Sequence, residues 1–184
     1  MIALTFDDGP NDPYTRQILD VLAEYGAKAT FFVIGKWVRQ SPEIVREVAA
    51  AGHEIGNHTE THPSGDYGDA EFLLCDEAIE NCGLKAPDCA RAPFGKSDAY
   101  RGHTFGVPFY GWDVHGGDWS ADSVEAITEP IFAYLDAHKS GIVLLHDGYY
   151  KEFGADRSKT VEATRRILER YKSEKFVTIG EYLQ

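Results

Sequence analysis

Short apolar runs and amphipathic stretches alternate along the chain, and each kind of stretch predicts one type of element. Runs rich in β-branched and aromatic residues predict buried strands, whereas apolar residues spaced three or four apart predict helices. About seven strands are predicted in this way, at residues 1–6, 29–34, 54–57, 89–92, 108–114, 142–146 and 176–178. Helices are predicted at residues 14–25, 41–52, 69–82, 122–139 and 158–172, the fourth of them kinked or restarted at Pro130.

The alternation of strands and helices predicts an α/β fold in which crossover helices join parallel strands. Two architectures satisfy this pattern, a (β/α) barrel and an open doubly wound sheet. The chain has no internal repeat, low-complexity tract or linker, so we expect residues 1–184 to form a single domain.

Chemically active side chains gather where the predicted strands end. These residues are Asp7 and Asp8 after the first strand, His58 after the third, Arg91 in the fourth, Asp118 after the fifth and His146 at the end of the sixth. In a β/α barrel the active site lies at the rim formed by the carboxyl ends of the strands. This placement predicts an enzyme.

Composition narrows the class of partner. The 184 residues include 30 acidic and 18 basic side chains, a net charge of −12, which argues against binding to nucleic acid. No apolar run approaches the roughly 18–20 residues that span a bilayer, so no membrane partner is expected. We also expect the protein to be a monomer. The early acidic pair argues against a signal peptide. The compartment stays open: secreted or cell-envelope if a leader has been removed, otherwise cytoplasmic.

The three cysteines are not expected to form disulfides or a zinc site. Their number is odd, and Cys75, Cys82 and Cys89 include no C-x-x-C pair. We expect them to be core or half-buried thiols.

Two segments carry candidate metal ligands. Asp7 and Asp8 are adjacent, so their side chains would point to opposite faces of a strand, one toward a metal and the other toward a substrate. His58 and His62 are four residues apart, which on a helical turn places both on one face. Two histidines and one aspartate leave an open position for water, as in catalytic zinc sites. The alternatives are a simple Asp-Gly-Pro turn and a pair of surface histidines.

His146 and Arg91 are the remaining candidates for chemistry. A histidine at the end of a buried strand is a general-acid candidate because it titrates near neutral pH, although it could simply cap the strand. Arg91 either holds a carboxylate ionised and in place or forms a surface ion pair.

Taken in order, five segments resemble the motifs of the polysaccharide deacetylases, the NodB-homology domain of carbohydrate esterase family 4. They read TFDDGP, HTETH, RAPFG, WDVHGGDW and LLHD and span residues 5 to 147. The resemblance implies a distorted, TIM-barrel-like (β/α) barrel of about seven parallel strands. It also implies a metal-dependent hydrolase, with Zn²⁺ or another divalent ion such as Co²⁺ or Mn²⁺ as cofactor.

The same resemblance implies a role for each matching position. Asp7 would be the general base, paired with Arg91, and His146 the general acid, tuned by Asp118. The implied metal ligands are Asp8, His58 and His62. The backbone N–H of Phe94 would help to bind the oxyanion, and the implied substrate-binding residues are Trp119, Leu144, Pro93 and Tyr149, of which Trp119 and Leu144 would line the acetyl pocket.

Two positions depart from the family pattern. Phe94 stands where many relatives have Tyr, but only its main-chain N–H is needed. His115 stands where relatives often have Asp or another small polar residue, and we expect it to fill the rim of the site. Beyond the last motif, Tyr149, Tyr150 and Phe153 could stack on pyranose faces or pack within their loop.

The leading hypothesis is removal of N-acetyl groups from GlcNAc-containing glycans, either chitin oligomers or peptidoglycan, with release of acetate. The alternatives are an acetylxylan esterase that removes O-acetyl groups, a catalytically inactive glycan-binding relative, and a hydrolase of small-molecule amides. The motifs do not separate amide from ester substrates. An inactive relative would be expected to have lost the base or a metal ligand, and this chain retains both.

Overall fold

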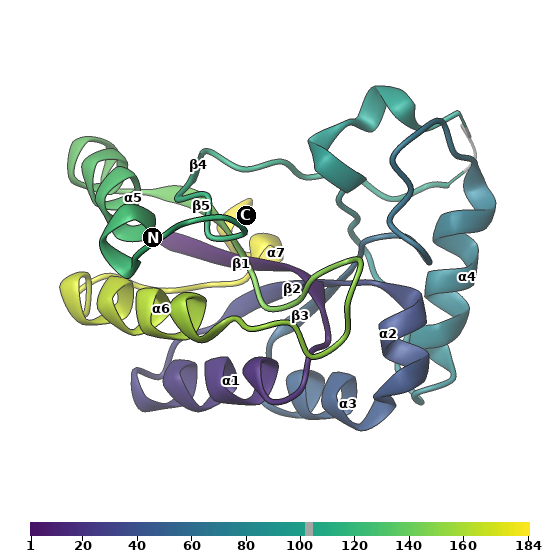
Figure 1. The fold of residues 1–184 in the computed structure, drawn as a ribbon, viewed down its shortest axis with the longest axis horizontal. Coiled ribbons are helices and arrows are strands. Elements are labelled where there is room, and N and C mark those ends of the chain that lie inside the picture. Colours follow the sequence, from purple (N-terminus) through teal and green to yellow (C-terminus); the bar gives the residue numbers. More distant parts are fainter. Residues whose placement is uncertain (102–104) are drawn as a thin grey trace.

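A parallel five-stranded sheet forms the centre of the computed structural model, which describes residues 1–101 and 105–184. Its strands are β1 (Ile2–Gly9), β2 (Ala29–Val33), β3 (Glu54–Asn57), β4 (Val114–His115) and β5 (Gly141–His146), arranged in the order β3-β2-β1-β5-β4. Every residue of the central strand β1 is buried, which explains why its first half is largely apolar. Figure 1 shows β1 running through the middle of the molecule.

The helices form a belt around this sheet. They are α1 (Tyr14–Glu24), α2 (Gly35–Gln40), α3 (Pro42–Ala50), α4 (Asp69–Glu80), α5 (Val124–His138), α6 (Ser158–Arg170) and α7 (Ile179–Tyr182). Contacts join neighbours in the order α5, α6, α1, α3, α2 and α4, and Figure 1 shows α6, α1 and α3 side by side. Each long helix turns an apolar stripe inward; α1, for example, buries Ile18, Val21 and Leu22 against the sheet.

The chain between Phe109 and Val114 brings the two edges of the sheet together. Beyond β3, single bridges pair Asn57 with Ala90 and Ala90 with Phe109. Five residues later Val114 pairs with Val143 of β5, at the opposite edge. A short segment therefore spans both edges and curls the sheet into a distorted barrel, which confirms the predicted α/β barrel class.

The number of full strands is smaller than the sequence predicts. The segments at 89–92 and 176–178 form only isolated bridges, from Ala90 to Asn57 and Phe109 and from Phe176 to Ile2. After Arg91 the chain enters a short 3₁₀ helix, η1 (Pro93–Gly95), and a proline has no N–H with which to extend a ladder. A second 3₁₀ helix, η2 (Ser97–Ala99), follows.

The helices also differ from expectation in two respects. The short helices α2 and α7 were not predicted, because six and four residues are too few to show a helical period. A restart at Pro130 is wrong, since α5 continues through it as one helix. The buried stripe of Ile127, Ile131 and Leu135 packs on both sides of the proline and compensates for one missing hydrogen bond.

The cysteines are as expected: all three are buried free thiols. Within residues 1–101 and 105–184, none of the helices combines the length and the apolar character needed to span a bilayer.

Candidate active site

Asp7 and Asp8 face the same cavity at the carboxyl end of β1. The pairing of β1 with β2 skips one residue, so that Asp7 lies opposite Phe32, Gly9 lies opposite Val33, and Asp8 forms a bulge with φ of 73°. Nε2 of His58 lies 3.6 Å from Oδ2 of Asp7 and 3.5 Å from Oδ1 of Asp8. The expectation that the two carboxylates point to opposite faces is therefore wrong, because a bulge with left-handed backbone breaks the alternation of the strand.

His58 and His62 come together on a loop, where the sequence predicted a helical turn. The residues after β3 are not helical, and Thr59 and His62 have φ of 72° and 57°. The side chain of Asn57 accepts a hydrogen bond from Thr59 N (2.8 Å), and the Thr59 hydroxyl accepts one from His62 N (3.0 Å). These bonds turn the chain so that the two imidazoles meet edge to face, with ring centres 4.9 Å apart.

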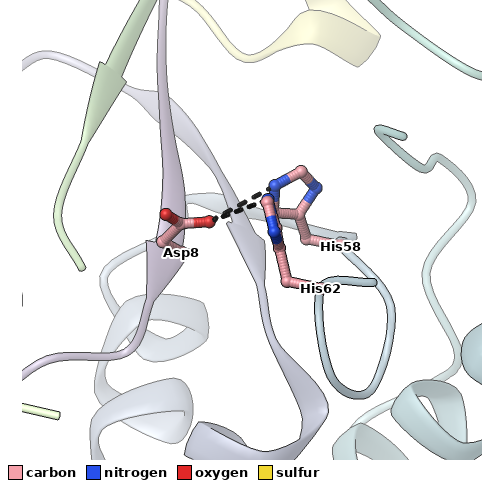
Figure 2. Close-up of side chains that lie close together, drawn as sticks. All are labelled: Asp8, His58 and His62. Atoms are coloured by element: carbon pink, nitrogen blue, oxygen red, sulfur yellow. Dashed lines mark ion pairs between the residues drawn. The ribbon is translucent and has the colours of Figure 1, made fainter. Parts of the chain in front are cut away.

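Asp8, His58 and His62 form a cluster that could hold a metal ion. One ligand atom from each lies within 4.8 Å of the others, and all three residues are buried (Figure 2). Nε2 of each histidine lies 3.5 Å from Oδ1 of Asp8, and this oxygen has no hydrogen-bond partner among the described residues. A buried carboxylate oxygen facing two imidazole nitrogens is a donor set that suits a divalent cation.

The electrostatics of Asp8 and His62 favour the forms that bind metals, whereas burial lowers the pKa of His58 but the neighbouring Asp7 and Asp8 outweigh it and raise that pKa. Burial raises the pKa of Asp8, but its contact with His58 and the charges of His146 and His58 outweigh this effect and hold that pKa below its usual range. Burial and the neighbouring His58 lower the pKa of His62 to about 3. Metal ligation requires an ionised carboxylate and a neutral imidazole, and Asp8 and His62 are held in those forms.

Arg91 is a buried cation beside Asp7. Its side chain is 1% exposed, and Nη1 donates to Oδ1 of Asp7 at 2.8 Å. Its other donors are satisfied by Thr5 Oγ1 and by the carbonyls of Tyr110 and Gly111, at 2.7 to 3.0 Å. The guanidinium therefore compensates a buried charge and fixes the position of the Asp7 carboxylate, as the functional interpretation of Arg91 predicts.

His146 ends β5 and is oriented by Asp118. Its Nδ1 lies 2.9 Å from Oδ1 of Asp118, and its backbone N donates to Oδ2 of the same carboxylate at 2.7 Å. Thr160 also donates to that oxygen. Burial lowers the pKa of His146, but Asp118, with smaller contributions from Asp8 and Asp7, raises it to about 9. A pKa in this range favours the protonated imidazole at neutral pH.

Known proteins share this architecture. A family model described as polysaccharide deacetylase matches residues 1–104, more than half of the chain. The peptidoglycan-N-acetylglucosamine deacetylase of Bacillus cereus is 38% identical over all of this chain and 88% of its own length. This chain belongs to the polysaccharide deacetylase family.

Two further members of the family are similar in sequence or in structure. The chitooligosaccharide deacetylase of a Bradyrhizobium species is 39% identical over 90% of this chain and 77% of its own. The solved structure of the peptidoglycan deacetylase PdaC from Bacillus subtilis superposes with a TM-score of 0.79 at 28% identity, covering 98% of this chain and 88% of that one. As a polysaccharide deacetylase the protein is a hydrolase that acts on carbon–nitrogen bonds.

The deacetylase site opens into a cavity of about 390 Å³. Besides the acids and histidines, its walls are formed by Phe94, Gly95, Trp112, Trp119, Leu144, Tyr149 and Tyr150. Trp119 is 47% exposed and packs edge to face against the ring of His146, with centres 5.3 Å apart. Phe94 lines the cavity with a ring that is 44% exposed, and its backbone is in the left-handed region, with φ of 57°.

Most predicted substrate-binding residues lie in this wall. Trp119, Leu144 and Tyr149 line the cavity, whereas Pro93 is buried, does not line the cavity and begins the 3₁₀ turn that carries Phe94. His115 is exposed and is not among the residues that line the cavity; its ring lies 5.1 Å from that of Trp119.

The sequence analysis did not single out Trp112 or Asp147. Trp112 lines the cavity and lies 5.6 Å from the Arg91 guanidinium. Trp112 is the first residue of the WDVHGGDW motif, so the sequence did contain a signal for this residue. Asp147 is buried beside Thr15, which donates to it, and burial raises the pKa of Asp147 to about 7. No local pattern could reveal the contact with Thr15, because 132 residues separate the two.

Proposed function

We propose that this deacetylase is a metal-dependent enzyme that removes N-acetyl groups from GlcNAc-containing glycans and releases acetate. The observation that carries the proposal is the presence of Asp8, His58 and His62 in one cavity with Asp7 and His146. The Bacillus cereus and Bradyrhizobium relatives are named for peptidoglycan and for chitooligosaccharides, two substrates that share N-acetylglucosamine. An N-acetyl amide is therefore the substrate group we assign.

The proposed cofactor is Zn²⁺, held by Asp8, His58 and His62. Three protein ligands of the nitrogen and oxygen type leave a coordination position open, which is typical of catalytic zinc. The ion would supply Lewis acidity, lowering the pKa of water and polarising the acetyl carbonyl. Buried Oδ1 of Asp8, which has no hydrogen-bond partner in the described part of the chain, supports this assignment.

Asp7 is the proposed general base. Its Oδ1 accepts from Arg91, and Oδ2 remains on the side of His58, within the cavity. That oxygen would take a proton from the attacking water as the C–O bond to the acetyl carbon forms. Arg91 keeps the carboxylate fixed in a buried position while this happens.

His146 is the proposed general acid. Asp118 orients its imidazole through Nδ1, which leaves Nε2 to face the cavity. Nε2 would give its proton to the amide nitrogen as the C–N bond breaks, so that a free amino sugar and acetate leave. The raised pKa of His146 supports this role, because the donor stays protonated at neutral pH.

The walls of the cavity are proposed to position the acetyl group. Trp119 and Leu144 offer apolar surface for its methyl group, beside the proposed acid. The backbone N–H of Phe94 is proposed to donate to the oxyanion, a type of contact worth about 2.7–4 kcal/mol in known enzymes. Tyr149 is proposed to contact the sugar, since aromatic rings suit the apolar faces of pyranoses.

Acetate release tests the proposal. The substrates are chitooligosaccharides, peptidoglycan and acetylated xylan, and the proteins are the Zn²⁺-loaded enzyme, the same enzyme treated with EDTA, and the variant Asp7→Asn. Asp20→Asn is the matched control, because Asp20 is an exposed carboxylate on α1. We expect acetate from the GlcNAc glycans, loss of activity with EDTA or Asp7→Asn, and full activity in the control.

Two results would contradict the proposal. Activity that survives both EDTA and Asp7→Asn would remove the metal and the base from the mechanism. Acetate released from xylan alone would assign the enzyme to ester substrates.

A further inference from the structure

The two histidines of the cluster differ in how their second ring nitrogen is held. Nδ1 of His58 lies 2.8 Å from the carbonyl oxygen of Arg91, a bond that fixes the ring and leaves Nε2 toward Asp8. Nδ1 of His62 is also buried, but it has no hydrogen-bond partner among residues 1–101 and 105–184. Metal-ligating histidines almost always donate from their second nitrogen, and that bond sets the orientation of the ring. Some other contact must orient His62.

Two aromatic rings enclose the imidazole of His62. The ring of Tyr150 stacks on it, with centres 4.4 Å apart and planes inclined by 24°. Phe94 meets it edge to face at 4.6 Å, and Phe94 and Tyr150 also contact each other. Rotation of His62 about its side-chain bonds would drive its ring into one of these two neighbours. The stacked ring of Tyr150 therefore restricts the same motion that a hydrogen bond at Nδ1 would restrict.

Tyr150 is itself held in place from the other side of the site. It belongs to the β5–α6 loop (residues 147–157), and Nζ of Lys36 donates to its carbonyl oxygen at 2.5 Å. Lys36 lies in α2, which follows directly after β2. The contact links the loop to a helix that packs against α3 and α4.

The base of the β5–α6 loop is tied independently of Lys36. Asn11 donates to the carbonyls of Asp147 and Ala155 and accepts from the N–H of Gly154. Arg157 donates to the carbonyl of Gly148 at 2.7 Å. These bonds hold both ends of the loop, so the part that carries Tyr150 is supported by the rest of the fold.

We infer that Tyr150 is a positioning residue for the metal site: its ring, held by Lys36, orients His62 in place of the missing hydrogen bond at Nδ1. The inference rests on the proposed function, since it takes Asp8, His58 and His62 as metal ligands. According to this inference, the aromatic ring of Tyr150 affects metal affinity and its phenol hydroxyl does not.

Metal affinity measured without substrate tests this inference. The dissociation constant for Zn²⁺ is obtained by competition with a chromophoric chelator, and the visible absorption of bound Co²⁺ reports the geometry of the ligands. We expect Tyr150→Ala to bind Zn²⁺ at least about 10-fold more weakly, the range typical for loss of a contact that orients a ligand. Tyr150→Phe keeps the ring and is expected to bind within about twofold of the parent protein. Lys36→Met is expected to weaken binding by a smaller factor.

Phe153→Ala is the matched control, since Phe153 lies in the same loop but packs against Trp37 and does not line the cavity. It should leave the affinity unchanged. If Tyr150→Ala fails to fold, as judged by circular dichroism, Tyr150→Leu fills the space without a stacking ring and gives the same comparison.

Three outcomes would overturn the inference or its basis. Unchanged affinity in Tyr150→Ala, or in Tyr150→Leu where the alanine variant does not fold, would show that the ring does not orient His62. An equal loss in Phe153→Ala would assign the effect to loop order. If the parent protein itself fails to bind Zn²⁺, the proposed metal site fails. If the parent binds Zn²⁺, His62→Ala does not, and Tyr150→Ala binds as tightly as the parent, the site stands and the inference alone is refuted.

Discussion

Replacing Asp118 with Asn tests whether Asp118 tunes His146, the proposed general acid. Asp118 contacts His146 twice, through its ring Nδ1 at 2.9 Å and its backbone N at 2.7 Å, and the substitution removes the charge with little change in volume. His146 must be protonated to donate, so kcat falls as the pH rises through its pKa. Because the Asp118 carboxylate raises that pKa, Asp118→Asn should move the alkaline fall in kcat to lower pH.

The structure bounds the size of the change. The pKa of His146 rises from 6.5 to about 9 against the opposing effect of burial, and Asp118 contributes more than Asp8 and Asp7. A rise of this size corresponds to roughly 3 kcal/mol, since each pKa unit is worth about 1.36 kcal/mol. If Asp118 supplies at least half of this, the alkaline limb moves down by more than about one pH unit.

The assay is acetate release at saturating chitooligosaccharide between about pH 6 and pH 10, with both proteins carrying the same metal. Thr160→Val is the matched control, because it removes a hydrogen bond to Asp118 while leaving the carboxylate charge. Its alkaline limb should move by less than half as much.

The reasoning is refuted if Asp118→Asn remains active and its alkaline limb lies within about 0.3 pH units of the parent enzyme. It is refuted equally if Thr160→Val moves the limb as far as Asp118→Asn, since the effect would then follow the hydrogen bond and not the charge.

Three further predictions follow from the site. Asp7→Asn should lower kcat by about 10²- to 10⁴-fold in the acetate assay while Zn²⁺ affinity stays within a few-fold; a loss of affinity that explains the lost activity would contradict its role as base. Arg91→Met leaves Asp7 as an uncompensated buried charge and should lower the free energy of unfolding by about 3–5 kcal/mol in denaturant titrations, part of which the double variant with Asp7→Asn should restore. A loss below about 1 kcal/mol would show that Arg91 does not compensate Asp7. Burial raises the pKa of Asp147 to about 7 in the folded protein, so the folded state favours the protonated acid and stability declines as the pH rises from about 4 to 7. In the metal-free protein, the melting temperature of Asp147→Asn relative to the parent should therefore be higher at pH 8 than at pH 5, and an equal difference at both values would contradict the shift.

Several elements of this deacetylase could be predicted from local sequence. The strands β1, β2 and β5 stand out as short buried runs, and α1 and α6 as amphipathic stretches, because burial on one or both faces imposes its period on the sequence. The clustering of active side chains after these strands followed from the parallel arrangement, in which the carboxyl ends of all strands lie on the same side.

The arrangement within the site could not be predicted in the same way. In a regular strand the side chains of Asp7 and Asp8 would point to opposite faces. The skipped pairing with β2 turns both of them toward His58. A helical turn would align His58 with His62, but a loop held by Asn57 and Thr59 performs this task. Such irregularities depend on pairing with other strands and on left-handed backbone, neither of which has a periodic signature.

By itself the sequence determined the fold class, the family and the side chains that could perform the chemistry, because these depend on residue type and on spacing along the chain. Only the tertiary structure decided which carboxylate meets which imidazole, that Arg91 and Asp7 are buried together, and that Tyr150 stacks on His62. Arg91 and Asp7 are 84 residues apart in the chain, and an even longer stretch separates Tyr150 from His62. Neighbours in a helix or a hairpin are much closer in sequence. Contacts of this kind form when β1, β5 and the segments beside β3 close around a common axis, and closure depends on steric fit across the whole barrel, which no local stretch of sequence encodes.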